Sequence, residues 1–253
     1  MPSSNLGLIL AAGNGSRLAS VSDTLPKPLI DLNGKPLLEH VLLDARDGGI
    51  ERFVIVLGYR GNLIRSWFES RRLHGIEVIW VENPDHKTKH NGISVLRARD
   101  VIDEPFVLFM TDHIFEPDTV ATLVRQPLGR DETILAVDRK LECIFDMDDA
   151  TKVRCIGNYI IDIGKQIKTY DAIDTGMFLC QPAIFDWLES ATIEGNCSLS
   201  DGMRLMAQQR KLRAFDIGDA MWQDVDTPDA LAYAHRLFLP EDPSNYSLEE
   251  VRV

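Results

Sequence analysis

The first half of the chain alternates short apolar runs with amphipathic stretches, and this rhythm constrains the fold more than any other feature. The apolar runs have the length of buried strands and lie at residues 6–11, 53–57, 76–81 and 106–110. Between them, apolar residues recur at helical spacing, at residues 37–45, 63–68 and 93–102. Strand–helix–strand connections of this kind are right-handed and build a parallel sheet covered by helices on both faces. The sequence therefore predicts an α/β fold around a mostly parallel central sheet.

After residue 130 the rhythm changes, because strand-like segments follow one another with few helices between them. These segments are 134–137, 152–156, 158–163 and 177–180. Helical patterns return at residues 184–188, 200–209 and 228–237. Neither an internal repeat nor a low-complexity linker divides the chain. We therefore expect one domain over residues 1–239, with a mixed or antiparallel insertion in its second half, and a polar tail at 240–253.

Composition and charge narrow the class of partner. The chain has 253 residues, of which 45% are hydrophobic, and this suffices for one large α/β domain. It carries 27 Lys and Arg against 39 Asp and Glu, a net charge of −12, which disfavours binding to nucleic acid or to an anionic membrane. No apolar run reaches the ~18 residues of a membrane span, and residues 6–12 lack the basic flank of a signal peptide. The 4 cysteines form no C-x-x-C pair, so we expect free, buried thiols in a reducing, cytoplasmic compartment.

A small loop with two glycines follows the first predicted strand. It reads Leu10-Ala11-Ala12-Gly13-Asn14-Gly15-Ser16-Arg17. Small residues let a backbone turn its N–H groups towards an anion, whereas the dinucleotide fingerprint is excluded because Leu18 replaces its third glycine. Arg17 and then Lys27, which lies between two prolines, add a guanidinium fork and a point charge suited to several phosphate oxygens. The loop therefore predicts a binding site for a triphosphate. The alternatives are that Arg17 is an ordinary surface charge and that Lys27 is a solvated loop lysine.

Acidic residues follow at positions where an open α/β sheet binds its ligand. Asp112, between Thr111 and His113, comes directly after the fourth predicted strand. A second acidic pair, Asp224 and Asp226, precedes the last predicted helix. Two carboxylates from distant parts of the chain can hold one Mg²⁺ and leave room for phosphate and water. Helix capping by Asp226 or Thr227 and an ordinary loop role for Asp112 are the alternatives.

A further glycine lies in the segment Asn91-Gly92-Ile93-Ser94, between the third strand and the next helix. A glycine at this point lets a nucleobase approach the backbone, and the helix start offers N–H donors. We therefore assign Asn91, Gly92 and Ser94 to the nucleotide, together with Thr111. A plain helix cap is the alternative.

These motifs resemble those of the nucleotidyltransferases of the glycosyltransferase-A-like (GT-A-like) fold, which join a nucleoside triphosphate to a sugar or polyol phosphate. The signature is Leu-Ala-Ala-Gly-x-Gly-x-Arg-Leu followed by Pro-Lys-Pro-Leu. The resemblance implies that Asp112 and Asp226 ligate the metal, with Asp224 close enough to be the ligand instead. It also implies that Lys165, which lies 11 residues before Gly176, is near the acceptor phosphate.

Further motifs narrow the resemblance to cytidylyltransferase domains that use CTP and inositol 1-phosphate to form CDP-inositol. They run in order between residues 7 and 235, and include Asn91-Gly92-x-Ser94-x-Leu96, Asp112-His113, Ala150-Thr151-Lys152-Val153, Ile163-Gly164-Lys165, Asp174-Thr175-Gly176-Met177-Phe178, Leu199-Ser200-Asp201 and Trp222-x-Asp224-Val225-Asp226-Thr227. The acceptor contacts implied are His113, Lys165, Asp174, Thr175 and Gly176. A structural hydrogen bond is the alternative role of His113. Known forms are often fused to a membrane-embedded synthase, which we do not expect in this chain.

The expected activity is Mg²⁺-dependent transfer of the cytidylyl group of CTP to inositol 1-phosphate, with release of pyrophosphate. The acceptor phosphate is already anionic at neutral pH, so Arg17, Lys27 and Lys165 would act by neutralising charge rather than as bases. An exposed loop lysine contributes little to folding, so loss of Lys27 should lower kcat far more than stability. A homodimer is compatible with the sequence.

Other activities stay open at this point. A sugar 1-phosphate or phosphocholine could be the acceptor, and UTP, dTTP, GTP or CTP the donor. A GT-A glycosyltransferase is disfavoured because Asp112-His113-Ile114 stands where its D-x-D motif is expected. A non-catalytic, nucleotide-binding regulatory subunit is the alternative from another class.

Overall fold

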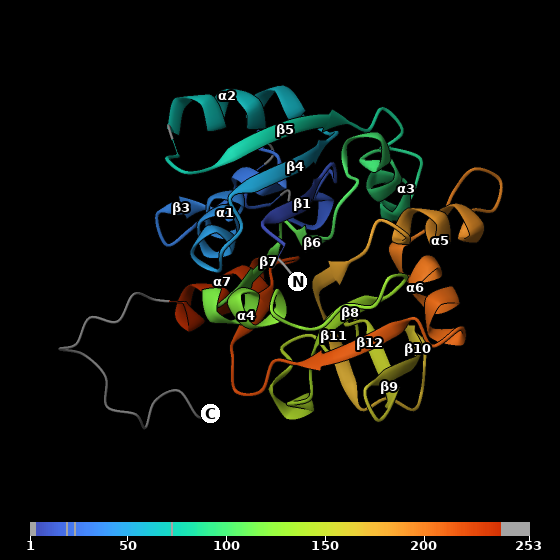
Figure 1. Ribbon diagram of the computed structural model, residues 1–253. Coiled ribbons are helices and arrows are strands. Elements are labelled where there is room, and N and C mark those ends of the chain that lie inside the picture. The colour runs from blue at the N-terminus through green and yellow to red at the C-terminus, as the bar shows by residue number, and fades with distance from the viewer. Residues whose placement is uncertain (1–3, 19, 23, 72, 239–253) are drawn as a thin grey trace.

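One nine-stranded sheet runs through the computed structural model, which describes residues 4–18, 20–22, 24–71 and 73–238 (Figure 1). The strand order is β5-β4-β1-β6-β11-β8-β12-β10-β9. The first four strands in this order are parallel, and they are β5 (Glu77–Glu82), β4 (Arg52–Leu57), β1 (Leu6–Ala11) and β6 (Phe106–Met110). The predicted parallel half of the sheet is therefore confirmed.

The second half of the chain adds strands of mixed direction to the same sheet. These are β11 (Ala172–Cys180), β8 (Thr133–Asp138), β12 (Leu212–Asp216), β10 (Tyr159–Gly164) and β9 (Lys152–Ile156). β11 is antiparallel to both β6 and β8, whereas β12 is parallel to β8. The mixed insertion predicted from the sequence is thus confirmed. β12 itself was not predicted, because its five residues include no β-branched side chain.

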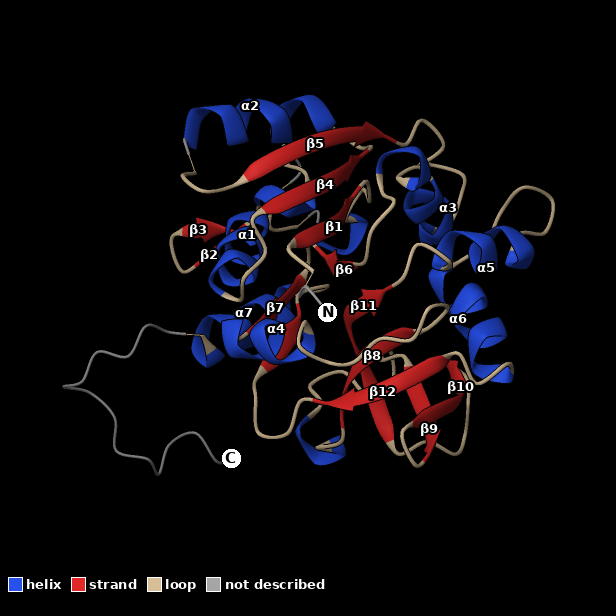
Figure 2. Ribbon diagram, in the orientation of Figure 1, coloured by secondary structure: helices blue, strands red, loops and turns tan. Residues whose placement is uncertain are grey.

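Helices cover both faces of the sheet, as expected (Figure 2). One face carries α1 (Leu37–Asp47), α2 (Gly61–Arg71), α4 (Pro117–Leu123) and α7 (Pro228–Leu237). The other carries α3 (Asn91–Leu96), α5 (Ile184–Ala191) and α6 (Leu199–Gln208). Alternation along β1 supplies both cores, since Ile9 packs into the first and Leu8 into the second. The inner parallel strands β1, β4 and β6 are buried on both faces, which explains their unbroken apolar runs.

Some elements differ from the expectation. The helix expected over residues 93–102 ends at Leu96, and a separate 3₁₀ turn follows at Arg99–Val101. Further 3₁₀ turns lie at Ser16–Leu18, Lys27–Leu29 and Leu141–Cys143. α4, with seven residues, was not predicted because it is too short to show a helical period.

Two small ribbons lie outside the main sheet. One pairs β2 (Asp31–Leu32) with β3 (Lys35–Pro36). The other pairs β7 (His113–Phe115) with β13 (Trp222–Asp224) in antiparallel register. This second ribbon brings two acidic regions of the sequence together.

The cysteines are only partly as expected. All four are free, and Cys180 and Cys197 are buried. Cys143 is exposed, however, so the expectation that every thiol is buried was wrong, because Cys143 ends a 3₁₀ turn at the surface rather than a strand. Within the described residues, none of the helices has the length and apolar character needed to cross a bilayer. The predicted tail and residue 239 lie outside the described part, and the homodimer and cytoplasmic location stay predictions.

Candidate active site

Two adjoining hollows lie at the carboxyl ends of the parallel strands β1 and β6. The larger is a cavity of about 300 Å³ between the β7–β13 ribbon, the segment 138–151 and α7. The smaller, of about 210 Å³, lies between the glycine loop and the start of α3. Three residues line both hollows, namely Asn91, Met110 and Asp112. Two ligands bound in these hollows would therefore meet beside Asp112.

The glycine loop forms part of the wall of the smaller hollow. The residues that line it are Leu10, Ala12 and Gly13. Ala11 is only 1% exposed and points into the hydrophobic core instead. Asn14 and Ser16 lie further along the loop at the surface, where Asn14 Oδ1 accepts a hydrogen bond from the backbone N–H of Ser16 at 3.4 Å.

Lys27 is packed against this loop. Gly15 has a φ of +60°, and a Cβ on it would lie 2.6 Å from Lys27 Cβ, so a glycine is needed both for the backbone conformation and for this close approach. The lysine is only 8% exposed. The alternative of a solvated lysine is wrong, because the loop folds the side chain inward. The expectation that loss of Lys27 lowers kcat far more than stability therefore loses its premise of an exposed lysine.

Carboxylates compensate the buried charge of Lys27. Its Nζ lies 2.6 Å from Asp112 Oδ2 and also pairs with Asp226 Oδ1. Burial alone would lower the pKa of Lys27, but Asp112, Asp226 and Asp224 raise it above its usual value. The ammonium is therefore charged at neutral pH and neutralises part of an acidic cluster.

The β7–β13 ribbon assembles this acidic cluster. Its register places His113 opposite Asp224, and ligand atoms of Asp112, His113 and Asp224 all lie within 4.8 Å of one another. His113 Nδ1 donates to Asp112 Oδ1 at 2.8 Å. Burial alone would lower the pKa of His113, but Asp224 and Asp112 raise it to about 9. Burial raises the pKa of Asp224 to about 7, although His113 opposes the shift.

The donor set fits a divalent cation. Asp224 Oδ1 is buried and has no hydrogen-bond partner within the described part of the chain, so a positive ligand would satisfy it. The carboxylates of Asp112 and Asp224 supply the hard oxygen donors that Mg²⁺ prefers, and His113 suits it less. Both oxygens of Asp226 are engaged, one by Lys27 and the other by Arg17. Both oxygens of Asp112 are engaged as well, by Lys27 and His113, so engagement alone does not choose between these carboxylates. Asp224 Oδ1, unpartnered within the described residues, favours Asp224 as one ligand, and Asp112 with Asp226 stays the prediction from the sequence.

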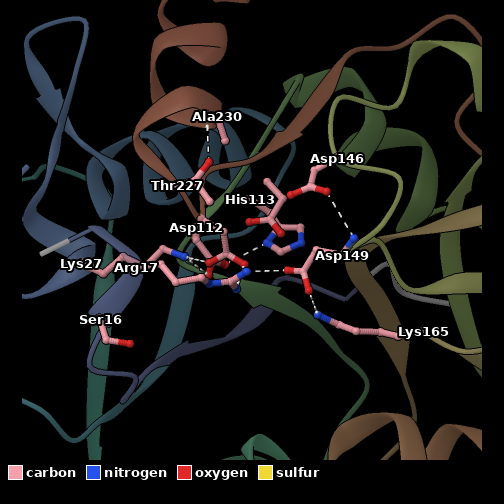
Figure 3. A network of polar contacts seen from close by, with 12 residues as sticks. Ser16, Arg17, Lys27, Asp112, His113, Asp146, Asp149, Lys165, Thr227 and Ala230 are labelled. Carbon is pink, nitrogen blue, oxygen red and sulfur yellow. Dashed lines mark hydrogen bonds and ion pairs between the residues drawn. The ribbon is translucent and has the colours of Figure 1, made fainter. Parts of the chain in front are cut away.

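A chain of ion pairs continues from Arg17 to the far side of the larger cavity (Figure 3). Arg17 pairs with Asp226 through Nη2 and with Asp149 Oδ2 through Nη1, the latter at 2.6 Å. The other oxygen of Asp149 lies 2.5 Å from Lys165 Nζ. The structure therefore brings Arg17, Lys27 and Lys165 to one region, as the sequence suggested. Asp149 was not singled out, since nothing in its local sequence marks it.

The three consecutive residues expected at the acceptor are placed differently from one another. Asp174 and Gly176 line the larger cavity. Burial raises the pKa of Asp174 to about 6, although its carboxylate accepts the Gly176 N–H. Thr175 is 3% exposed, and its hydroxyl donates a hydrogen bond to the carbonyl of Ala136 at 2.8 Å. Its side chain therefore links β11 to β8 within the sheet rather than facing the cavity. Gly176 has a φ of +75°, and a Cβ there would lie 2.5 Å from the ring of His113.

The residues expected at the nucleobase lie around the smaller hollow. Asn91, Ser94 and Thr111 line it. Each also makes a hydrogen bond within the protein: Asn91 Oδ1 accepts from the first N–H of α6, Ser94 Oγ accepts from Asn83 Nδ2, and Thr111 Oγ1 donates to the carbonyl of Leu10. These bonds fix the wall of the hollow and hold α3 against α6.

Gly92 does not line either hollow. A Cβ on it would lie 2.6 Å from the carbonyl oxygen of Cys197, so the glycine permits close packing against the segment before α6. Close packing thus explains why a glycine is needed at position 92, and contact of Gly92 with a nucleobase stays a prediction.

The larger cavity has an aromatic wall that the sequence did not predict. Phe145 stacks on Tyr233 with ring centroids 4.7 Å apart. Trp222 stacks on His113 at 5.8 Å and donates its Nε1–H to the buried Asp138 at 2.9 Å. Trp222 lies in β13 and Tyr233 in α7, which follows it, whereas Phe145 comes from a segment far earlier in the chain, and no local pattern joins the three.

Comparison with known proteins defines the class of this protein. Residues 7–212 match the model of the MobA-like NTP transferase domain, so the chain belongs to this family of nucleotidyltransferases. A relative from Rubrobacter xylanophilus, named a bifunctional IPC transferase and DIPP synthase, is 36% identical over 91% of this chain and 51% of its own length. A protein of the same name from Aquifex aeolicus is 32% identical over 90% of this chain and 50% of its own. The chain thus spans about half the length of these curated relatives.

Solved structures agree on the fold. The inositol-1-phosphate CTP transferase from T. maritima superposes with a TM-score of 0.81 at 26% identity, covering 95% of this chain and 99% of that one. A UDP-glucose pyrophosphorylase in complex with UDP-glucose superposes with a TM-score of 0.77 at 19% identity, covering 92% and 98%. The predicted GT-A-like fold and the predicted class, nucleotidyltransferase, are confirmed.

Proposed function

We propose that this protein transfers the cytidylyl group of CTP to the phosphate of inositol 1-phosphate, releasing pyrophosphate and forming CDP-inositol. One observation carries the proposal: a hollow beside the glycine loop and Lys27 adjoins a cavity beside Lys165, and the two share Asp112. The motifs of the sequence and the names of the relatives support the choice of CTP and inositol 1-phosphate.

In this proposal, the smaller hollow receives the nucleotide. Arg17 and Lys27 give up some of their hydrogen bonds to carboxylates and donate instead to oxygens of the triphosphate, because the triphosphate carries a greater negative charge. Asp112, with Asp226 or Asp224, would hold Mg²⁺, which neutralises phosphate charge when it is bound. Release of Asp226 by the two cations would make this carboxylate free for the metal.

The acceptor occupies the larger cavity, with its phosphate near Lys165. A phosphate oxygen of the acceptor forms a bond to the α-phosphorus of CTP as the bond from that phosphorus to the β-phosphate oxygen breaks, and pyrophosphate leaves. The attacking oxygen is already anionic at neutral pH, so no side chain needs to remove a proton. The work of Arg17, Lys27 and Lys165 is to bring two anions together and to neutralise charge. Asp174 faces the same cavity and can accept hydrogen bonds from the hydroxyl groups of a polyol.

One observation favours a second candidate. The aromatic wall formed by Phe145, Tyr233 and Trp222 would suit a cationic head group, such as that of phosphocholine, through cation–π contacts. The same triphosphate chemistry would then produce a CDP-alcohol of a different kind.

Release of pyrophosphate from four nucleoside triphosphates, each with inositol 1-phosphate, phosphocholine or glucose 1-phosphate, tests the proposal in the presence of Mg²⁺. We expect the highest kcat/KM with CTP and inositol 1-phosphate. A signal only with phosphocholine would favour the second candidate, and one only with UTP or dTTP and glucose 1-phosphate would refute the proposed substrates. No pyrophosphate with any pair would favour a regulatory, non-catalytic protein.

A pair of variants tests the acceptor side. Lys165→Met should raise the KM for the acceptor strongly, because the phosphate loses its cation. Lys168→Met is a matched control, since this nearby lysine is exposed and forms no ion pair within the described residues.

A further inference from the structure

Asp149 lies between the triphosphate side and the acceptor side of the site, and the sequence motifs assign it no role. We propose that Asp149 is a positioning residue that holds Arg17 and Lys165 next to each other, so that the two phosphate groups bind within reach of each other. The proposal rests on the proposed function of the site and adds to it the group that links its two halves.

The geometry assigns one carboxylate oxygen to each cation (Figure 3). Asp149 Oδ2 is 2.6 Å from Arg17 Nη1, and Asp149 Oδ1 is 2.5 Å from Lys165 Nζ. Two positive side chains that would otherwise repel each other are thereby held on a single carboxyl group. Arg17 comes from the loop after β1 and Lys165 follows β10, so Asp149 connects the two halves of the sheet.

The loop itself fixes the position of Asp149. Asp146 Oδ1 accepts a hydrogen bond from the Asp149 N–H at 3.2 Å, and the Asp146 carbonyl accepts one from Ala150 at 3.0 Å. Lys152 Nζ donates to the carbonyl of Asp148 at 3.1 Å. The carboxylate is therefore presented by a hydrogen-bonded turn rather than by a free loop.

The ion pairs of Asp149 with Arg17 and Lys165 contribute too little to folding stability for stability to be their role. The side chains of Arg17, Asp149 and Lys165 are 50%, 34% and 48% exposed. Ion pairs between side chains this exposed contribute only about 0–1 kcal/mol to folding. Hydrogen bonds from Lys165 and Arg17 nevertheless keep the pKa of the Asp149 carboxyl below its usual value, against the effect of partial burial, so that it is ionised at neutral pH.

Both cations keep donors for substrates while they are bound to Asp149. Arg17 has five N–H donors, of which Asp149 and Asp226 take two, leaving three. Lys165 has three donors and Asp149 takes one, leaving two. Asp149 can thus orient both side chains without displacing phosphate from them.

Kinetics of Asp149→Asn against Asp148→Asn test the proposal. Asp148 lies next to Asp149 on the same turn, and its side chain makes no hydrogen bond within the described residues, so its variant controls for loss of one charge. With the best substrate pair, Asp149→Asn should lower kcat/KM for the acceptor by about 10- to 100-fold, because small displacements of binding groups have effects of this size. Asp148→Asn should stay within about twofold of the wild type, Asp149→Glu should restore part of the loss, and the melting temperature should change by less than about 2 °C.

Measuring Asp149→Asn in a protein that already carries Lys165→Met tests whether Asp149 acts by positioning Lys165 or independently of it. In the Lys165→Met background, Asp149→Asn should lower kcat/KM by clearly less than it does in the wild type, because only the part of the effect that acts through Arg17 remains. Fully additive losses would overturn the proposal. So would a higher acceptor affinity or a higher kcat in Asp149→Asn, which simple electrostatics predicts because removing a negative charge favours anionic substrates.

Failure of the proposed role of Asp149 can be distinguished from failure of the proposed function. If the wild type prefers another nucleotide or acceptor, the proposed substrates fail, and the Asp149 variants are measured with the preferred pair. If the wild type releases no pyrophosphate, calorimetry with CTP and with inorganic phosphate decides, since Asp149→Asn should weaken both relative to Asp148→Asn. Unchanged or tighter binding of both would refute the role of Asp149.

Discussion

Replacement of Lys27 by methionine should make the stability of the protein depend on Mg²⁺. The Lys27 side chain is 9% exposed, and those of its partners Asp112 and Asp226 are 23% and 22% exposed. Removing one member of a buried ion pair costs about 3–5 kcal/mol. Because both carboxylates keep some access to water, we expect about 2–3 kcal/mol in this case. For a chain of this size that is a fall of about 5–10 °C in melting temperature.

Methionine has a similar volume and leaves the packing against Gly15 in place, so the loss should be electrostatic. Without the ammonium, Mg²⁺ meets less competition at Asp112 and Asp226, although His113 and Arg17 still bond to these carboxylates. A metal concentration of 100 times its Kd contributes about 2.7 kcal/mol, which would offset the loss. Turnover should stay about 10²- to 10³-fold low even in Mg²⁺, because the triphosphate has lost its cation.

Thermal unfolding in EDTA and in a series of Mg²⁺ concentrations measures the first effect, and pyrophosphate release measures the second. Lys35→Met is the matched control, since Lys35 is exposed and has no ion pair within the part of the chain described. A Lys27→Met protein with the melting temperature of the wild type in EDTA, and no added response to Mg²⁺, would refute the reasoning.

Four further variants test the site and its supporting fold. Asp224→Asn and Asp226→Asn should differ in Mg²⁺ affinity, measured by calorimetry in the presence of nucleotide, and equal affinities would show that neither alone is the second ligand. Gly176→Ala should lower kcat at least about 10-fold, since the added Cβ meets the His113 ring; wild-type kinetics would contradict this. Burial raises the pKa of Asp44 from 3.8 to about 7, so the folded state keeps a proton that the unfolded chain releases, and stability should fall as the pH rises from about 4 to about 7. Asp44→Asn should remove this dependence and melt at a higher temperature than the wild type at pH 8, as scanning calorimetry would show.

The sequence predicted the parallel half of the fold well for a physical reason. Strands buried on both faces, such as β4 and β6, need apolar residues at every position, which leaves a continuous signal. The glycine loop could be located from the sequence because its backbone conformation, with a positive φ at Gly15, calls for glycine at that position. β12 and α4 were missed because each is short and takes its stability from tertiary contacts.

The candidate site was predicted only in part because its contacts are non-local. Asp224 and Asp226 are two residues apart, and side chains at this spacing face the same way in an extended chain, so the spacing alone could not choose between them. The burial of Lys27 depends on Asp112 and Gly15 approaching it from other segments. Asp149 pairs with Arg17 across 132 positions of sequence, and no local pattern encodes such a pair.

The β7–β13 ribbon also sets the order in which the site can form during synthesis. His113 emerges from the ribosome long before its partner Asp224, which belongs to one of the last described strands. A nascent chain that already contains the glycine loop and Asp112 therefore lacks half of the acidic cluster until β13 has been made. Affinity for Mg²⁺ should accordingly appear late in translation, as a sign that β13 has paired with β7.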